Sequence, residues 1–392
     1  MSTAPAASLA ELQDLERAYA APTYIRSPVQ FVRGEGVLLW DEHGHEYLDF
    51  LAGISVLNVG HCHPRVVAAI QEQAARLTHV TNLYYTEPAM RLAKALSDSS
   101  LGGKVFFCNS GAEANEAALK LVRRARPGGE IVVLRDAFHG RTYGALSATP
   151  QESKQAPFAP LVPGFVVVAK DPDALRAAVG PQTAAVLLEP IQGESGVLPL
   201  SQELLLAARE ACDATGAALV FDEIQTGMGR TGTVWAYEQS GVVPDAITSA
   251  KALGGGLPIG ALITGPALAD VFQPGDHGST FAGGPVACAA ALVALELCSD
   301  PELLRSVVEL GERLAGSLAE LPFVASVRGR GLLIGAELEP GVDAAELARR
   351  ALAEERLVLN ATSPSSLRLE PPLVVTAQQI DEAVARLARL LP

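Results

Sequence analysis

The sequence predicts an α/β fold, with a large domain built on a mostly parallel seven-stranded sheet and a smaller α+β domain at the C-terminus. Three observations lead to this prediction. Short apolar segments alternate with helical patterns from residue 104 to about residue 285, which is typical of a doubly wound parallel sheet. After Ser299-Asp300-Pro301 the pattern changes to helices mixed with a strand pair. A chain of 392 residues is also long enough for two domains.

Composition and charge exclude several classes of protein. An apolar content of 49% with 19% charged residues describes a well-buried globular chain, and a net charge of −14 argues against a nucleic-acid partner. The N-terminus lacks the basic and apolar regions of a secretory signal, and the longest apolar run, Val286 to Cys298, is too short to span a bilayer. Five scattered cysteines, an odd number, favour reduced thiols over a disulfide framework. We therefore expect a soluble, cytoplasmic protein with neither a membrane nor a nucleic-acid partner.

The first elements are a helix and a hairpin. Residues 1–20 have the pattern of a short amphipathic helix. Apolar runs at 37–40 and 46–50, joined by a turn, predict a β-hairpin. Pro64 then opens a helix with a period of 3.6, since proline is favoured in the first turn. The cluster His61-Cys62-His63 before it does not have the ligand spacing of a zinc site, so we expect a turn there and no metal.

Seven short apolar segments supply the strands of the large sheet. They lie at residues 104–108, 130–134, 164–168, 184–188, 217–221, 246–249 and 260–264. The C-terminal part follows as helix 302–320, strands near 324–327 and 331–337, helix 343–355, a strand at 367–369 and helix 377–391. These elements predict three parts: an N-terminal segment, 1–50, that packs with the small domain, a large ligand-binding domain, 51–298, and the small domain, 299–392.

Two strand ends carry the residues on which the functional prediction depends. The run 217–221 ends on Asp222, and the run 246–249 is followed by Lys251. Ligands of open α/β sheets bind outside the carboxyl ends of the strands, so both side chains should face one crevice. This pair suits a pyridoxal phosphate enzyme, in which a lysine forms a Schiff base and an acid pairs with the pyridinium nitrogen. On these two residues alone, a structural ion pair is an equal alternative.

Three more strand ends carry polar, turn-forming residues. The segment 109–116 opens a helix with small residues, where the helix N-terminus favours a phosphate, although an ordinary Ser110 N-cap explains the same residues. Phe138 offers a ring for stacking and Arg141 a bidentate site for a carboxylate; a core phenylalanine and a structural arginine are the alternative. The loop 189–194 holds two acids and an amide. Five such strand ends at one edge of a sheet together favour a ligand site.

The lysines support the choice of Lys251. The chain has only six, Lys94, Lys104, Lys120, Lys154, Lys170 and Lys251. Five of them lie on helical patterns, before a strand, or in polar turns. Lys251 is flanked by small apolar residues and glycines, so burial can lower its pKa enough for imine chemistry.

Together these motifs carry a family resemblance. The chain resembles the class III (ω-amino acid) pyridoxal-phosphate aminotransferases, a fold-type I family, and within them the enzymes that act on N2-acetylornithine. The resemblance covers nearly the whole chain from about residue 25. It runs through Asp49–Ile54, Gly60–Pro64, Asn82–Tyr85, Asn109–Glu116, Phe138–Thr142, Glu189–Glu194, Asp222–Gly227, Lys251 and Arg368–Leu373.

The resemblance implies a role for each residue around the cofactor. Lys251 would be the Schiff-base lysine and proton shuttle, and Asp222 would keep the ring nitrogen protonated. Gln225 would contact the ring hydroxyl, and Phe138 would stack on the ring.

The implied phosphate site is shared between subunits. The backbone amides of Gly111 and Ala112, with the region of Ser110, would bind the phosphate. Thr280 would reach the same phosphate from the other subunit, so the resemblance implies a homodimer with shared active sites.

The implied substrate site serves two substrates in turn. Arg141 would bind the carboxylate farther from the reacting carbon, and Arg368 the α-carboxylate of glutamate. Glu194 would pair with Arg368 while an ω-amine is bound, so that no buried charge stays unpaired. Ile54 stands where ornithine aminotransferases place a tyrosine that holds the free α-amino group, which favours a substrate with an acylated α-amine.

The resemblance therefore implies transfer of the δ-amino group of N2-acetylornithine to 2-oxoglutarate, giving N-acetylglutamate semialdehyde and glutamate, a step of arginine biosynthesis. Alternatives are a related ω-aminotransferase acting on ornithine, succinyl-diaminopimelate, 4-aminobutyrate or a carrier-linked lysine-pathway substrate. A same-fold isomerase does not need two arginines with a gating acid. A catalytically silent binding protein does not need the pair Asp222 and Lys251.

Overall fold

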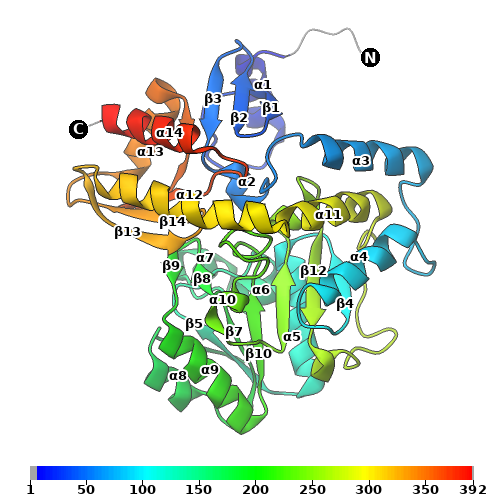
Figure 1. Ribbon diagram of the computed structural model, residues 1–392. Helices are drawn as coiled ribbons and strands as arrows, with labels where there is room; N and C mark the ends of the chain where they lie inside the picture. Colours follow the sequence, from blue (N-terminus) through cyan, green and yellow to red (C-terminus); the bar gives the residue numbers. More distant parts are fainter. Residues whose placement is uncertain (1–6, 391–392) are drawn as a thin grey trace.

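A seven-stranded sheet lies at the centre of the chain, which a computed structural model describes from residue 7 to residue 390 (Figure 1). In spatial order its strands are β4 (Val105–Cys108), β12 (Gly260–Thr264), β11 (Ala246–Ser249), β10 (Ala218–Asp222), β7 (Thr183–Leu188), β5 (Glu130–Leu134) and β6 (Phe165–Val168). All seven predicted strands are present, and the mostly parallel sheet is confirmed.

Strand β12 departs from the doubly wound parallel pattern, because it runs antiparallel to both of its neighbours, β11 and β4. Only residues 250–259 join β11 to β12. A parallel connection needs a crossover of about a dozen residues or more, usually with a helix, and this segment is too short for one.

Both faces of the sheet are buried. On one face Val133, Leu187 and Val220 share a core with apolar residues of α5 (Gly111–Ala125). On the other face their chain neighbours, such as Phe221, share a core with residues of α9 (Gln202–Thr215). Since successive side chains of a strand point to opposite faces, strands covered on both sides are mostly apolar along their length, as these are.

Helix α11 (Pro285–Cys298) contains the longest apolar run and packs against α3 (Pro64–Arg76) and α4 (Glu87–Asp98). Its residues Cys288, Ala291 and Ala294 are fully buried, so its apolar character is explained by packing inside the protein. Across residues 7–390, no helix is both long enough and apolar enough to cross a membrane.

The C-terminal elements form an antiparallel sheet covered by helices. The sheet order is β13 (Val324–Arg330), β14 (Leu333–Leu338), β17 (Ser366–Leu369) and β16 (Asn360–Ser363), and the helices are α12 (Pro301–Ala319), α13 (Ala344–Glu355) and α14 (Ala377–Arg389). The predicted helices and strands of this part are confirmed, although the last residue of the predicted helix 377–391 lies outside the described residues. Strand β16 was not predicted.

The N-terminal strands pair with a strand from the C-terminal part. A second four-stranded sheet has the order β1 (Phe31–Glu35), β2 (Leu38–Asp41), β3 (Glu46–Asp49) and β15 (Leu357–Val358). β2 and β3 form the predicted hairpin, whereas β3 and β15 pair in parallel. Figure 1 accordingly places the blue N-terminal strands beside the orange and red C-terminal helices. Neither β1 nor the two-residue β15 has a pattern that predicts a strand.

The helix predicted over residues 1–20 is observed as α1 (Leu9–Tyr19); residues 1–6 lie outside the described part. The remaining elements are short. They are α2 (Ala52–Ser55), α6 (Tyr143–Ser147), α7 (Glu152–Gln155), η1 (Ala156–Phe158), α8 (Pro172–Ala178), β8 (Ile191–Gln192), β9 (Leu198–Pro199), α10 (Tyr237–Ser240), η2 (Lys251–Gly254) and η3 (Pro266–Leu268).

Candidate active site

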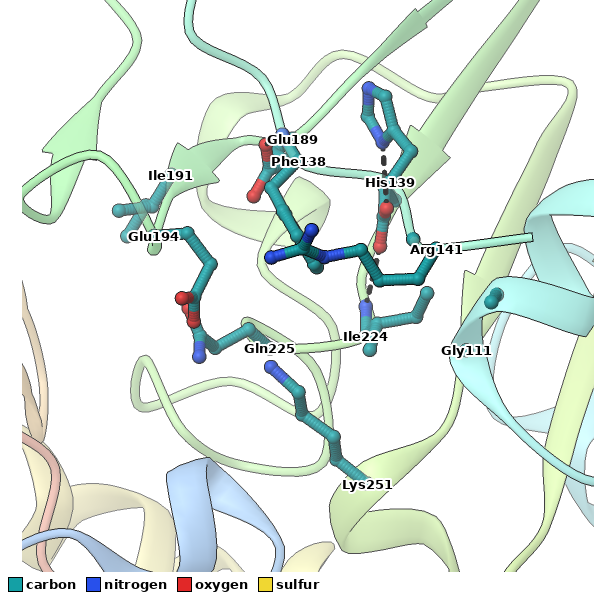
Figure 2. A pocket seen from close by; sticks show the side chains of 13 residues that line it. Gly111, Phe138, His139, Arg141, Glu189, Ile191, Glu194, Ile224, Gln225 and Lys251 are labelled. Carbon is teal, nitrogen blue, oxygen red and sulfur yellow. Dashed lines mark hydrogen bonds and ion pairs between the residues drawn. The ribbon is translucent and has the colours of Figure 1, made fainter. Parts of the chain in front are cut away.

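A cavity of about 250 Å³ lies where β5, β7, β10 and β11 end. Its lining comes from all the strand ends that the sequence singled out. The lining residues are Gly111, Ala112, Phe138, His139, Gly140, Arg141, Glu189, Ile191, Glu194, Asp222, Ile224, Gln225 and Lys251. The predicted crevice at the carboxyl edge of the sheet is therefore present, and Figure 2 shows it from close by.

Asp222 is the last residue of β10 and is buried, with 4% of its surface exposed. Its Oδ2 accepts a hydrogen bond from Asn115 Nδ2 at 2.7 Å and lies 2.8 Å from His139 Nδ1. Its Oδ1 accepts one from the backbone N–H of Ile224 at 3.1 Å. These contacts fix the orientation of a carboxylate that faces the cavity.

Asn115 and His139 are the residues that sequence reasoning missed. Asn115, in α5, also donates to the His139 carbonyl at 2.7 Å and accepts from Thr248 Oγ1 at 2.8 Å. His139 Nε2 is buried and has no hydrogen-bond partner within residues 7–390. Both residues lie inside motifs that were recognised, and the sequence signal for Asn115 is a polar residue among the alanines of a helix that the structure buries.

Lys251 follows β11 and points its amine into the cavity, toward Gln225 (Figure 2). Its backbone is left-handed, with φ of +47°, which is uncommon for a side chain of this kind and is often found at functional sites. Burial lowers the pKa of Lys251, although the carboxylates of Glu194 and Glu370 oppose this shift. A lowered pKa leaves more of the neutral amine, which is the nucleophilic form.

Gln225 links the lysine to an arginine behind it. With its amide oxygen turned toward the two cations, Gln225 accepts hydrogen bonds from Lys251 Nζ at 2.9 Å and from Arg368 Nη1 at 3.1 Å. The Gln225 side chain therefore bridges Lys251, the predicted Schiff-base residue, and Arg368, the predicted carboxylate-binding residue.

Arg368 is fully buried in β17 and pairs with Glu194, whose Oε1 lies 2.6 Å from Nη1. The wall of the cavity at this point is formed by Glu194 and Gln225, with Arg368 behind them. Burial raises the pKa of Glu194, but the charges of Arg368 and Lys251 more than offset this and hold the pKa below its ordinary value. The predicted association of Glu194 with Arg368 is thus present in the folded chain.

Phe138 and Arg141 occupy the opposite side of the cavity. The guanidinium carbon of Arg141 lies 5.7 Å from the centre of the Phe138 ring, and Lys154 Nζ lies 5.8 Å from the same ring. Arg141 is exposed and reaches across the cavity in Figure 2. Two cations therefore flank this ring, which makes this end of the cavity attractive to an anion.

Two further acids differ in their surroundings. Glu189 lines the cavity and accepts from the Phe138 backbone N–H at 2.9 Å; burial raises its pKa to about 7. Glu223, next to Asp222, points away and accepts from Thr226 Oγ1 and from the backbone of Ala236 and Tyr237. The second of the two adjacent acids therefore supports the loop after β10, whereas the first faces the cavity.

The N-terminus of α5 forms the predicted anion-binding end. Ser110 Oγ accepts from the Glu113 backbone N–H at 3.2 Å, so the ordinary N-cap is present. Gly111 and Ala112 line the cavity, and the first N–H groups of a helix have no intrahelical acceptor. The Ser110 side chain is engaged in the cap, which leaves the backbone of the next two residues to face an anion.

Four predicted site residues do not line this cavity: Ser110, Arg368, Ile54 and Thr280. Ile54 is partly buried in α2, where its φ is +66°, and Thr280 is exposed on a loop. The loop of Thr280 contacts two segments: Asn109 Nδ2 donates to Ser279 Oγ at 3.1 Å, and Asn82 Nδ2 donates to the Ala282 carbonyl at 2.9 Å.

The residues present fit pyridoxal phosphate. A buried carboxylate at one strand end, a lysine with a lowered pKa at another, an aromatic ring and a helix N-terminus match the pyridinium nitrogen, aldehyde, ring face and phosphate of that cofactor. All four groups line one cavity, which is the arrangement that such a ligand requires.

Comparison with known proteins gives the same assignment. The sequence profile of the family Aminotransferase class-III matches residues 19–391. The chain is 46% identical, over 95% of both chains, to an acetylornithine aminotransferase of Methanocaldococcus jannaschii.

Two solved structures show the same fold. An N-acetylornithine aminotransferase from Stenotrophomonas maltophilia superimposes with a TM-score of 0.82 at 37% identity, covering 96% of this chain and 97% of that one. An ornithine aminotransferase from Toxoplasma gondii, with partial occupancy of PLP at its active site, gives a TM-score of 0.92 at 34% identity over 97% and 93%. The chain belongs to the class III aminotransferases, a family of pyridoxal-phosphate-dependent enzymes with the type I fold.

Proposed function

We propose that this aminotransferase moves the δ-amino group of N2-acetylornithine to 2-oxoglutarate, giving N-acetylglutamate semialdehyde and glutamate in arginine biosynthesis. The observation that carries the proposal is the buried pair of Arg368 and Glu194 beside Lys251, with Arg141 at the other end of the cavity. One arginine is exposed to the cavity and one is covered by an acid, which suits two substrates that differ by a carboxylate near the reacting carbon.

The cofactor is held by residues of the strand ends. Lys251 would attach it, Asp222 would pair with its ring nitrogen, Gln225 would contact its ring hydroxyl, and Phe138 would stack on the ring. When bound, pyridoxal phosphate withdraws electrons from the substrate carbon that carries the amino group, so that this carbon loses its proton. Lys251 Nζ, freed once the substrate amine has taken its place on the cofactor, would accept that proton and return it, for which its lowered pKa is suited.

The backbone amides of Gly111 and Ala112, at the N-terminus of α5, would hold the phosphate. Arg141 binds the carboxylate of acetylornithine, which lies far from the reacting δ-carbon. During this half-reaction Glu194 stays on Arg368, because a buried arginine without a counter-ion is unfavourable. When glutamate binds, its α-carboxylate replaces Glu194 on the guanidinium.

Acylation of the α-amine fits the charges around Arg141. Lys154 lies beside the same ring as Arg141, and burial followed by the charge of Arg141 lowers the pKa of Lys154. A free α-ammonium group would add a third positive charge to this end of the cavity, whereas an acetylated amine is neutral. Neither Ile54 nor Lys154 lines the cavity of one chain, so we assign the preference mainly to Arg141, which does, with Lys154 adding positive charge beside the Phe138 ring.

We also infer a cytoplasmic homodimer with shared sites. The exposed loop of Thr280 lies next to Phe281, which is 67% exposed, and is hydrogen-bonded to the segment that leads to Tyr84 and Tyr85, also largely exposed. Such a cluster of exposed aromatic residues suits coverage by a second copy. Thr280 then reaches the second subunit's phosphate. We also propose that the chain divides into an N-terminal segment (1–50), a large ligand-binding domain (51–298) and a small C-terminal domain (299–392).

A spectral titration tests the substrate. The cofactor-loaded enzyme is mixed with acetylornithine, ornithine, 4-aminobutyrate, succinyl-diaminopimelate and glutamate, and the absorbance change of the cofactor is followed. We expect acetylornithine to react at a higher kcat/KM than ornithine, and 2-oxoglutarate to restore the starting spectrum. A preference for ornithine or 4-aminobutyrate would favour a related ω-aminotransferase instead.

Arginine variants test the assignment of the two carboxylate sites. Arg141→Ala should raise KM in both half-reactions, because both substrates place a distal carboxylate there. Arg368→Ala should raise KM mainly for glutamate and 2-oxoglutarate. The expected loss is roughly tenfold to a hundredfold in kcat/KM, the size of one charge-assisted hydrogen bond. Equal losses for both substrates in Arg368→Ala would contradict the assignment.

A further inference from the structure

Arg368 has a second carboxylate beside it, which belongs to Glu370. Glu370 follows β17 two residues after Arg368, so both side chains lie on the same face of the extended chain. The Glu370 Oε1 lies 3.3 Å from Arg368 Nε, and neither side chain has any exposed surface. One buried guanidinium thus lies between two acids, Glu194 on one side and Glu370 on the other.

The two acids differ in mobility. Glu194 lines the cavity and its side chain is 30% exposed, so it has room to turn away. Glu370 is held at both ends: its backbone N–H donates to the Phe50 carbonyl at 2.8 Å, and its Oε2 accepts from Ser55 Oγ at 2.6 Å. Ser55 is itself 1% exposed. Glu370 therefore stays in place whatever Glu194 does.

Two polar atoms of this cluster lack hydrogen bonds. Arg368 Nη2 and Glu370 Oε1 are buried without a hydrogen-bond partner in the described part of the chain. Nη1 is occupied by Glu194 and the Gly193 carbonyl, and Nε faces Asn360 Oδ1 at 3.2 Å. The guanidinium therefore keeps one free donor edge, while Glu370 already offsets its charge from the inner side.

We propose that Glu370 is a positioning residue that serves as the fixed counter-ion of Arg368 and thereby helps to set the balance between acetylornithine and glutamate. With Glu370 present, Arg368 remains compensated when Glu194 turns away, so opening the gate does not leave a lone buried cation. The same fixed charge weakens the attraction of Arg368 for any further carboxylate, whether from Glu194 or from a substrate. This inference rests on the two-substrate function proposed above.

A four-protein cycle isolates the effect of the charge at position 370. The proteins are the wild type, Glu370→Gln, Glu194→Gln and the double variant, all loaded with cofactor. For each, kcat/KM is measured for glutamate and for acetylornithine in single half-reactions. The affinity for glutarate, a dicarboxylate without a reactive amino or keto group, is measured by calorimetry as a readout that does not need turnover.

We expect the largest change in the kcat/KM ratio and in the glutarate Kd where Glu194 cannot neutralise Arg368. In the Glu194→Gln background, removing the charge of Glu370 leaves Arg368 as an uncompensated cation. The ratio of kcat/KM for glutamate to that for acetylornithine should then rise by about tenfold or more, and the Kd of glutarate should fall by a similar factor. In the wild-type background the change should be smaller, since Glu194 still neutralises the guanidinium.

Glu203→Gln provides the matched control, because it makes the same acid-to-amide change at an exposed position of α9. Its glutamate-to-acetylornithine ratio should match that of the wild type. If Glu370→Gln does not fold, Glu370→Leu replaces it, with folding checked by Tm. If the double variant has the same glutamate-to-acetylornithine ratio and the same glutarate Kd as Glu194→Gln, the proposal is overturned and Glu370 has a purely structural role.

The same measurements distinguish a failure of this proposal from a failure of the proposed function. If the wild type reacts with neither acetylornithine nor glutamate, the proposed function fails. The glutarate affinities still report whether Glu370 offsets the charge of Arg368.

Discussion

At the scale of the residue, Asp222 depends on side chains far away in the sequence. Asn115 holds Asp222 at 2.7 Å and is itself anchored by Thr248, and His139 adds a contact at 2.8 Å. The network is fully buried, where hydrogen bonds are stronger and missing partners more costly than in water. The proposed pairing of Asp222 with the ring nitrogen of the cofactor therefore relies on how these neighbours position the carboxylate.

Asn115→Ala should lower kcat by roughly tenfold to a hundredfold, because Asp222 loses a buried donor and is no longer held opposite the ring nitrogen. KM for acetylornithine should change little, since Asn115 does not line the cavity. Steady-state kinetics measure both values. Thr248→Val is the control: it removes the bond to Asn115 but keeps the one to Asp222, so its effect should be smaller. A loss confined to KM would contradict the positioning role.

Lys251→Ala should abolish turnover, because no other described lysine lines the cavity. The variant should still fold and bind some cofactor through its phosphate and ring contacts. Turnover is measured with acetylornithine and cofactor content by absorbance. Lys94→Ala, on the exposed side of α4, is the control and should retain wild-type activity. Ordinary turnover in Lys251→Ala would disprove its assignment.

At the scale of the element, the loop after β10 turns two adjacent acids in opposite directions. Asp222 faces the cavity, while Glu223 binds Thr226 Oγ1 at 2.6 Å and the N–H groups of Ala236 and Tyr237 at 3.0 and 2.8 Å. Glu223 thereby fastens both ends of the segment 223–237. Although these donors lower its pKa, burial is the larger effect and raises it to about 7.

The raised pKa of Glu223 predicts a pH dependence of stability. In the unfolded chain the group titrates near 4.5, so between about pH 4.5 and pH 7 the folded state binds more protons than the unfolded state. The stability present below pH 4.5 is therefore lost as the pH rises to 7, by up to about 3 kcal/mol. Glu223→Gln does not titrate and should lack this part of the decline.

Unfolding by urea at pH 5 and pH 7.5 measures the difference between the wild type and Glu223→Gln. Glu203→Gln, an exposed acid in α9, serves as the control and should follow the wild type. Parallel pH profiles for the wild type and Glu223→Gln would show that Glu223 is ionised in the folded protein throughout this range.

At the scale of the whole molecule, a buried arginine joins distant parts of the chain. Arg230 has no exposed surface and donates to the carbonyls of Leu332, at 3.0 Å, and Pro371, and to the side chain of Asn58. Burial lowers its pKa to about 10, which still leaves it charged at neutral pH. The segment after α2, the loop after β10 and the C-terminal sheet are thereby held together.

Shared active sites predict complementation between two inactive variants. Thr280→Glu should prevent phosphate binding in the second subunit's site by charge repulsion, and Lys251→Ala disables a subunit's own site. Mixed in equal amounts, unfolded and refolded together, they form heterodimers in which one site has both an intact Lys251 and an intact Thr280. Random pairing should restore about a quarter of wild-type activity. Each variant alone is the control, and a mixture as inactive as its components would contradict a shared site.

The sequence by itself determined which segments form the main sheet and which residues follow its strands, among them Asp222 and Lys251. Strands covered on both faces must be apolar along their length, so the seven segments stand out locally, and residues after parallel strands must meet at one edge. Asp222, Lys251, Phe138 and Arg141 lie in the cavity for that reason. The pairing of Arg368 with Glu194 followed from the family resemblance.

Only the tertiary structure decided contacts between residues that are distant in the chain. The pairing of β3 with β15 and the partners of Asn115 and Glu370 are set by packing and leave no periodic pattern in the sequence. Ile54 is a further example. The residues next to it in the sequence match a substrate site, but its side chain does not line the cavity. Local patterns encode burial, whereas a side chain's partner depends on the summed geometry of all the elements between them.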